Sequence, residues 1–255
     1  MRNWILSFAF SALVAVLPRD ASASRQSDFK AEEVIAKMRA AYGALTSYAD
    51  SGTVLDETTG FTDRSTFKTL ISRNPRNLLI EFRAVASEYK SGHRMPISHH
   101  MALWLEKDDL HTWSSRTQEH ETYGADQQVY GIKSANYSTL GISILVPSHF
   151  YTRSGLASVL HATEEAEADG YETVNGRRSF RIRGVERWRY PSGRETGVRP
   201  ITIWIDAETY LIQKILQDTP RGFPRGQISR RITTLKHRAN PRLEPAEFRF
   251  VVPPG

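Results

Sequence analysis

The hydrophobic positions of the chain change their spacing from helical to strand-like near residue 48. Between Asp28 and Leu45, apolar side chains recur every three to four residues. This spacing predicts an amphipathic helix, with Asp28 as its N-terminal cap. From Tyr48 onward the period is two, as in strands that bury one face.

Most of the remaining chain is predicted to form hairpins. Turn residues separate the alternating segments at Asn74–Asn77 and at Val174–Arg177, where an Asn-Gly pair is a strong hairpin signal. Glu88–His100 is expected to be a long connection. The predicted strands cover residues 48–55, 66–72, 78–83, 101–105, 110–114, 180–183, 201–205, 210–216, 228–235 and 248–252.

A segment with weaker periodicity interrupts the hairpins. Gln127–Leu140 is weakly helical, and Ile142–Leu160 is rich in apolar residues. We expect these segments and the first helix to cover the sheet, because an antiparallel sheet of this size must curl and bury its apolar face. The pattern predicts a mainly β (α+β) fold, with an antiparallel sheet of about ten strands that must curl or close.

Residues 1–23 are predicted to be a signal peptide. Arg2 precedes the uncharged apolar run Trp4–Leu17, and Ala21–Ala23 has the small-x-small pattern of a cleavage site. The run of 14 residues is shorter than the roughly 20 of a membrane span, so an uncleaved anchor is the less favoured alternative. We therefore expect cleavage near Ala23, one domain over residues 24–255, and a periplasmic location.

Composition narrows the class of protein further. The chain has no cysteine, which excludes disulfides, thiolate metal sites and a cysteine nucleophile. An exported chain without cysteine suits a bacterial periplasm. The excess of 34 Lys and Arg over 28 Asp and Glu could attract anionic partners, but export argues against nucleic acid, and the arginines around Arg177–Arg183 fit solvated strand faces.

The sequence gives no strong sign of catalysis, a metal or a cofactor. It lacks the Gly-x-Ser-x-Gly nucleophile elbow and a phosphate-binding glycine loop. Five histidines occur close together without a metal-ligand spacing: His93, His99, His100, His111 and His120. We therefore predict no catalytic residue, no metal ligand and no cofactor.

The most prominent feature is apolar. Large side chains recur at every second position of successive strands, opposite polar neighbours, and two short helical segments are too small to fill a concavity of about ten strands. An ordinary core is the plainer interpretation for any one residue. We predict that an apolar ligand cavity is lined by Phe67, Ile71, Leu78, Ile80, Phe82, Leu103, Ile201, Ile203 and Phe250.

Three short stretches resemble a known family. These are MRAAYGALTSYADSGTV at Met38–Val54, ITIWIDAETYLIQKI at Ile201–Ile215 and PAEFRFVVPPG at Pro245–Gly255. The strand pair within Phe67–Arg83 also fits. The chain is similar here to the LolA/LolB-like periplasmic lipoprotein-carrier superfamily, which includes outer-membrane lipoprotein-sorting proteins.

The resemblance implies an unclosed barrel with a helical lid over an apolar cavity that binds acyl chains of lipoproteins or lipids. It also implies an arginine near the lid, for which Arg73 and Arg83 are candidates. We expect a monomeric, non-catalytic carrier or sensor. Its candidate partners are envelope proteins of the inner or outer membrane that deliver the ligand or receive it. The alternatives are a secreted hydrolase whose site is hidden in the tertiary structure and an envelope protein-interaction module.

Overall fold

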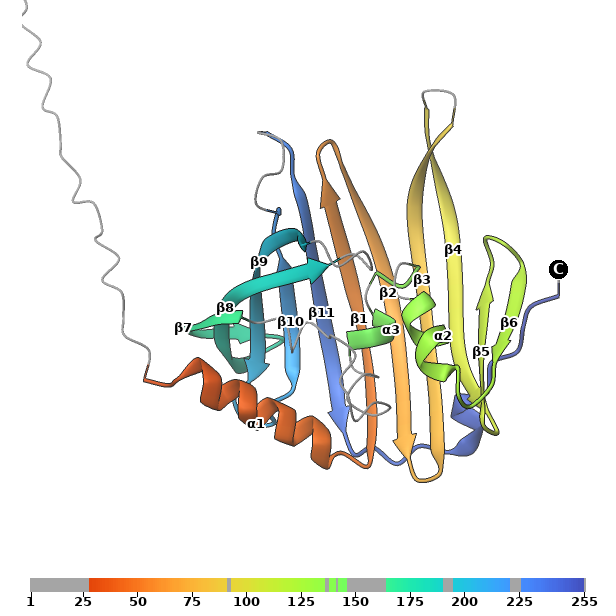
Figure 1. The fold of residues 1–255 in the computed structure, drawn as a ribbon, viewed down its shortest axis with the longest axis horizontal. Coiled ribbons are helices and arrows are strands. Elements are labelled where there is room, and N and C mark those ends of the chain that lie inside the picture. Colours follow the sequence, from red (N-terminus) through yellow and green to blue (C-terminus); the bar gives the residue numbers. More distant parts are fainter. Residues whose placement is uncertain are drawn as a thin grey trace, which may run out of the picture.

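The fold is one large antiparallel sheet with helices on one of its faces (Figure 1). The computed structural model describes residues 28–90, 93–135, 138–140, 142–145, 164–189, 195–220 and 226–254. The helical elements are α1 (Ala31–Ala44), α2 (Gln128–Ser134), α3 (Ile142–Leu145) and the 3-10 helix η1 (Pro245–Phe248). The strands are β1 (Ser47–Thr58), β2 (Phe61–Arg73), β3 (Arg76–Lys90), β4 (His93–Glu106), β5 (Asp109–Ser114), β6 (Glu119–Tyr123), β7 (Glu164–Val174), β8 (Arg177–Arg189), β9 (Glu195–Asp206), β10 (Ile212–Gln217) and β11 (Ser229–Ala239).

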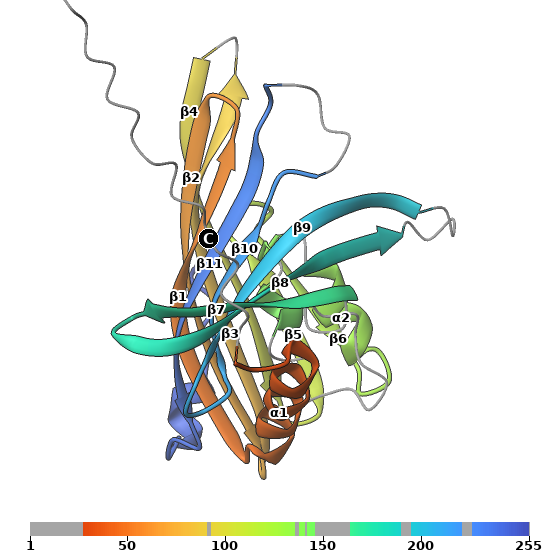
Figure 2. The ribbon, with the colours of Figure 1, turned by 90° about the vertical axis from the view of Figure 1, so that its left-hand side faces the viewer.

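The strand order explains why the sheet stays open. The order is β6-β5-β4-β3-β2-β1-β11-β10-β9-β8-β7, and β6 and β7 are its two edges. The first and last strands pair at the centre, where Tyr48 lies opposite Ala239 and Thr58 opposite Ser229. Seen from the side, the sheet is strongly bent, with β7, β8 and β9 turning across the other strands (Figure 2). The predicted curved, unclosed antiparallel sheet is therefore confirmed.

The two faces of the sheet have separate hydrophobic clusters, because successive side chains of a strand point to opposite faces. The larger cluster lies on the concave face, where α1, α2 and α3 pack (Figure 2). The smaller one lies on the convex face beneath the C-terminal segment. Alternation along β4 illustrates the division, since Leu103 belongs to the concave cluster and Trp104 to the convex one.

Helix α1 covers the part of the concave face near β7 to β10. Its buried side chains are Ala31, Val34, Ile35, Met38 and Tyr42, the predicted apolar stripe. The predicted cap was wrong, since the helix begins after Lys30 and no side chain caps it. Glu32 and Glu33 in its first turn are placed favourably for the helix dipole.

Two predicted boundaries were wrong. The stretch Glu88–His100 is no long connection, because β3 continues to Lys90 and β4 begins at His93. The last predicted strand is also replaced: Pro245–Phe248 forms η1, closed by a capping box between Glu244 and Glu247. This short helix directs the following residues across the convex face without strand pairing among those described.

Two turn predictions were right. Chain reversal occurs at Asn74 and Pro75, between β2 and β3. The β7–β8 turn uses the Asn-Gly pair, with φ of +52° at Asn175 and +78° at Gly176. Positive φ at both positions matches the twist of the flanking strands.

Part of the sequence analysis lies outside the described residues. This applies to the predicted signal peptide at residues 1–23 and to residues 146–160 of the apolar stretch after α3. Among the helices of the described ranges, none is long and apolar enough to cross a membrane.

Candidate functional site

The structure brings together eight of the nine predicted cavity residues. They belong to the concave cluster, with at most 5% of any side chain exposed. The eight are Phe67, Ile71, Leu78, Ile80, Phe82, Leu103, Ile201 and Ile203. Most of them are packed against neighbours in the core, and Phe82 is the member that also lines a described pocket.

Phe250 is the exception, and its predicted placement was wrong. It packs on the convex face, with its ring centroid 5.0 Å from that of Trp104 and 5.6 Å from that of Trp113. The helix η1 and the segment after it carry Phe250 to that side. The period-two pattern of Phe248, Phe250 and Val252 could not reveal which face the segment would cover.

An open pocket of about 660 Å³ lies where the concave face meets the α2–α3 insertion. Its size is typical of ligand pockets, which span roughly 300–1,000 Å³. Strand register sets its floor, because Ser65 lies opposite Ala84 and Ala84 opposite His99. The pocket is lined by Asp56, Asp63, Ser65, Phe82, Ala84, His99, Ser114, Arg116, Thr117, Ser138 and Leu140.

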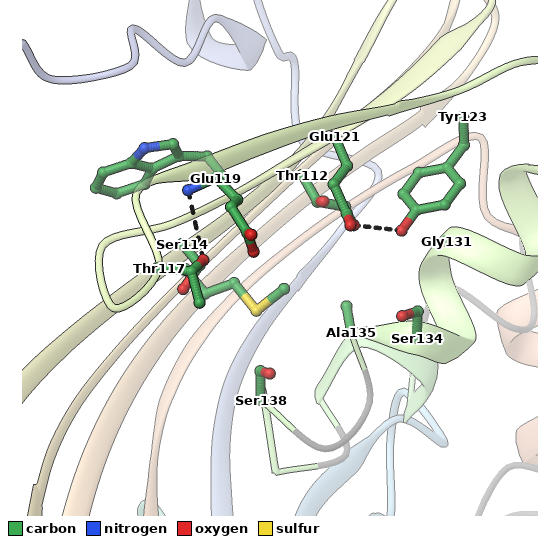
Figure 3. A pocket seen from close by; sticks show the side chains of 12 residues that line it. Thr112, Ser114, Thr117, Glu119, Glu121, Tyr123, Gly131, Ser134, Ala135 and Ser138 are labelled. Carbon is green, nitrogen blue, oxygen red and sulfur yellow. Dashed lines mark hydrogen bonds between the residues drawn. The ribbon is translucent and has the colours of Figure 1, made fainter.

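A smaller recess of about 170 Å³ adjoins this pocket (Figure 3). The two share Ser114, Thr117 and Ser138. Strand β6 supplies Glu119, Glu121 and Tyr123 to the recess, and α2 supplies Gly131 and Ser134. Figure 3 shows the Tyr123 hydroxyl donating a hydrogen bond to the Glu121 carboxylate. The pocket and the recess therefore form one continuous space. Phe82 and Ala84 give it an apolar surface on the sheet, and Glu119 and Glu121 give it a polar one on β6.

Two carboxylates face each other at one end of the pocket. Asp56 on β1 and Asp63 on β2 are direct cross-strand partners. Like charges in that relationship destabilise a sheet. The Nη2 atom of Arg231 lies 3.0 Å from Oδ2 of Asp56, and its Nη1 donates to the Leu140 main-chain oxygen at 3.4 Å. Arg231 thus joins the sheet, the acidic pair and the insertion.

Arg231 is a further arginine near the insertion, which the sequence analysis did not single out. Of the two candidates, Arg73 contacts a helix: its Nε donates to the Leu45 oxygen just after α1, at 2.7 Å. Arg83 pairs with Glu81 at 3.6 Å and is largely exposed. Arg231 could have been found from the strand period, because Thr233 and Leu235 are buried two and four positions further on.

The opposite end of the pocket has a histidine, an arginine and hydroxyl groups. His99 Nε2 lies 3.2 Å from the Ser114 hydroxyl. Burial of the His99 ring, and next the nearby charge of Arg116, lower the pKa of His99. His99 is therefore neutral at physiological pH, and Arg116 is the principal cation at this end.

A serine hydroxyl next to a histidine ring, as in Ser114 and His99, is also the pairing from which a hydrolytic triad starts. A serine nucleophile needs a base that is itself oriented by a third group, usually an acid. Within the described ranges, no carboxylate hydrogen-bonds to His99. Among the described residues, the Ser114–His99 pair therefore lacks the third member of such a triad.

His100, His111 and His120 pack against the tryptophans of the convex face. His111 Nδ1 is 3.1 Å from His120 Nε2, and both rings stack on Trp104. His100 packs edge-on against Trp113. The described residues contain no group of three or more His, Cys, Asp or Glu side chains placed to hold a metal ion.

A buried carboxyl lies under α1, away from the pocket. The Tyr48 hydroxyl donates to Asp50 Oδ2 at 2.8 Å, and the side chain and backbone of Thr69 also hydrogen-bond to this carboxyl. Burial raises the pKa of Asp50 to about 7, although the Tyr48 hydrogen bond opposes the shift. The group is thus poised to gain or lose a proton near neutral pH.

Comparison with known proteins relates part of the chain to a protein family. Residues 110–222 match the family model described as LppX_LprAFG lipoprotein, a segment of less than half the chain. The predicted resemblance to the LolA-like superfamily is confirmed. A search of curated proteins found no match.

Solved structures similar to this chain include two mycobacterial proteins. LprF from Mycobacterium bovis has a TM-score of 0.47 and 13% identity, covering 81% of this chain and 91% of LprF. LppX from Mycobacterium tuberculosis has a TM-score of 0.41 and 16% identity, covering 84% of this chain and 98% of LppX. A LolA superfamily protein from Nitrosomonas europaea has a TM-score of 0.31 and 9% identity, covering 87% of this chain and 98% of that protein.

Proposed function

We propose that the protein is a non-catalytic periplasmic carrier or sensor that binds acyl chains of lipids or lipoproteins. The observation that carries this proposal is the open pocket between the concave sheet face and the α2–α3 insertion. Phe82, Ala84 and Leu140 give it an apolar surface that borders the main core. Each methylene group buried there would contribute about 0.8 kcal/mol without needing a polar partner.

The packing of the core limits where the chains can lie. Ile71, Leu78, Ile80 and Leu103 are fully buried against other side chains, so they support the pocket and do not line it. Of the nine residues predicted from the sequence, Phe82 is the one that lines this pocket. Exchange of the ligand would involve movement of the insertion, which Arg231 joins to the sheet through Leu140.

Uptake of a fluorescent fatty acid tests the proposal. We expect saturable binding by the purified chain, and competition by unlabelled lipid. Mass spectrometry of material that copurifies from the native envelope should identify acyl lipids. No saturable uptake by delipidated, folded protein would overturn the carrier proposal and favour the envelope interaction module.

Export and processing have a separate test. The proposed periplasmic domain comprises residues 24–255, after removal of the signal peptide. N-terminal sequencing of envelope extracts should give a mature end at or near Ser24. An intact Trp4–Leu17 segment recovered with membranes would contradict cleavage.

A further inference from the structure

Strand β6 is an edge of the sheet with a regular register. Its five residues, Glu119–Tyr123, pair with β5 without a register shift. No described strand pairs with β6 on its other side (Figure 1), and residues 119–122 are exposed. An edge strand directs the N–H and C=O groups of alternate residues away from its neighbour. These groups are therefore available to hydrogen-bond with an added strand of another polypeptide.

The opposite edge, β7, is built differently. Two register shifts interrupt its pairing with β8, and φ is positive at Glu165 (+56°) and at Gly170 (+84°). Irregularities of this kind bend and twist an edge strand, which disfavours pairing with another chain. Of the two edges of the described sheet, β6 is therefore the regular template for an added strand.

The two sides of β6 differ in chemistry. Glu119, Glu121 and Tyr123 point into the recess between β6 and α2 (Figure 3). His120, between them, stacks on Trp104 on the convex side. Among the described residues, neither glutamate forms an ion pair with a Lys or Arg side chain. The concave side of this edge therefore presents two carboxylates that have no cation of their own.

The basic residues nearest in sequence lie outside β6. Arg116 precedes the strand and lies near His99 in the larger pocket, and Lys133 is exposed on α2. Asp126, between β6 and α2, adds a further exposed carboxylate. Residues 116–134 thus include three acidic side chains and two Lys or Arg, and β6 itself has two glutamates and neither Lys nor Arg.

This charge pattern distinguishes between occupants of the edge. Antiparallel pairing with a second copy, centred on β6, would place Glu121 opposite Glu121, and like charges directly opposite each other destabilise a sheet. A strand with Lys or Arg opposite Glu119 and Glu121 would be stabilised by the same carboxylates. The edge therefore disfavours self-association and favours a basic segment of another protein.

An exposed aromatic side chain adjoins the C-terminal end of β6. Tyr130 on α2 is 67% exposed, and its ring centroid lies 6.0 Å from that of Tyr123. Tyrosine is enriched at protein interfaces relative to the rest of the surface. An apolar side chain of an added strand can pack against Tyr130 at this end.

We propose that the β6 edge binds an extended, basic segment of a partner protein as an added antiparallel strand. The main chain of the segment pairs with β6, and Lys or Arg side chains two residues apart lie opposite Glu121 and Glu119. Because the strands are antiparallel, an apolar residue that precedes the basic ones lies opposite Tyr123, beside Tyr130. This interaction surface goes beyond the proposed acyl-binding function and does not depend on it.

Short extended peptides test the surface. The parent peptide, Thr-Leu-Thr-Lys-Thr-Lys-Thr with blocked ends, has the required alternation, and its counterpart has Glu in place of both Lys. Fluorescence anisotropy of the labelled parent should show saturable binding to the purified chain. The counterpart should bind at least about tenfold more weakly, because repulsion replaces attraction at both glutamates. Equal binding of the two peptides, or no binding of the parent, would overturn the proposal.

Methylation of the peptide main chain separates strand addition from simple charge attraction. Methyl groups on the nitrogens of Leu and both Lys, or on those of the Thr residues instead, remove the N–H donors from one edge of the peptide and keep its charge. Only one edge of an added strand faces β6. One methylated peptide should therefore bind at least about tenfold more weakly than the parent, and the other within about threefold of it. Equal binding of both would contradict strand addition.

Matched variants locate the charge recognition. The double variant Glu119→Gln, Glu121→Gln should bind the parent peptide at least about threefold more weakly, because glutamine keeps the size of the side chain and removes its charge. Glu32→Gln makes the same change at an exposed site on α1 and should preserve binding. Circular dichroism would establish that both variants are folded. Fatty acid uptake is measured without the peptide, so the acyl-binding proposal stands or fails separately. Unchanged peptide binding by the folded double variant would overturn the assignment of the β6 edge.

Discussion

Arg231 donates a hydrogen bond from Nη1 to the main-chain oxygen of Leu140 at 3.4 Å, across 91 positions of the sequence. The same guanidinium contacts Asp56 at 3.0 Å. Because Leu140 lines the pocket, Arg231 couples the position of the insertion to the charge at the pocket wall.

Replacing Arg231 by glutamine should loosen the insertion. The change removes a charged hydrogen bond and leaves Asp56 opposite Asp63 without this cation, at a cost of roughly 1.5–3 kcal/mol in the free energy of unfolding. If half of that energy holds the insertion in place, a bound fluorescent fatty acid should dissociate up to about tenfold faster. Stopped-flow displacement would measure the rate.

Arg230→Gln is the matched control for that variant. Arg230 is the adjacent residue on β11, and it makes partly exposed contacts with Glu57 and Asp218. Exposed ion pairs contribute at most about 1 kcal/mol, so stability and dissociation should change little. Equal dissociation rates for both variants and the unmodified protein would show that the Leu140 contact does not control exchange.

Filling the pocket with a larger side chain should weaken fatty acid binding without lowering the stability of the fold. Ala84 is 9% exposed and lines the pocket, so Ala84→Leu adds volume where space exists. We expect fatty acid affinity to fall at least about tenfold, the equivalent of roughly two buried methylene groups. Thermal unfolding should change little, and calorimetry alongside the uptake assay checks both quantities.

Shortening a core residue should lower the stability of the fold and leave ligand binding intact, the reverse of filling the pocket. Ile203 is 1% exposed and packed in the concave cluster, so Ile203→Ala should lower the free energy of unfolding by roughly 2–5 kcal/mol. Binding by the remaining folded protein should be retained. If Ile203→Ala abolished uptake while Ala84→Leu preserved it, the acyl site would lie under α1 instead of beneath the insertion.

The buried carboxyl of Asp50 should make stability depend on pH. Its pKa is about 7 in the folded protein and about 3.9 in an unfolded chain, so the folded state retains the proton to higher pH. Stability from this group is therefore fully present below about pH 4 and is lost as pH rises towards 7, by up to about 4 kcal/mol.

Denaturant unfolding between pH 4 and 8 measures this dependence. Asp50→Asn should reduce the decline, because an amide cannot ionise and can still accept the Tyr48 hydroxyl proton. Asp126→Asn, at an exposed site, should retain it. Identical pH profiles for Asp50→Asn and the unmodified chain would exclude Asp50 as the source.

Two glycines should respond oppositely to alanine. At Gly52 on β1, a Cβ atom would lie 1.9 Å from the Thr234 oxygen and 2.5 Å from the Phe67 ring. Gly52→Ala should cost at least about 3 kcal/mol, because the main chain of β11 would have to move. Gly43 in α1 has open space around it, and Gly43→Ala should stabilise by up to about 1 kcal/mol. Chemical denaturation compares the two; similar effects would contradict this account.

The sequence by itself determined the local elements and the general architecture. The recurrence of Leu78, Ile80 and Phe82 at every second position predicts a strand with these side chains on one face. The Asn175-Gly176 pair predicts the hairpin turn between β7 and β8. Both signals depend only on neighbouring residues. The helical period of α1 is equally local. Together these patterns predicted a large antiparallel sheet that curls or closes, covered by helical segments, and the resemblance to the LolA-like superfamily implied that it stays open.

Only the tertiary structure decided which surfaces meet. Alternation divides a strand into two faces but does not say what covers each, so Phe250 could not be placed on the convex side with Trp104. The pairing of Asp56 with Asp63 depends on strand register, and the contact between Arg231 and Leu140 depends on where the insertion packs. Contacts between residues far apart in sequence arise from the packing of whole elements, and the periodicity within each element carries no information about them.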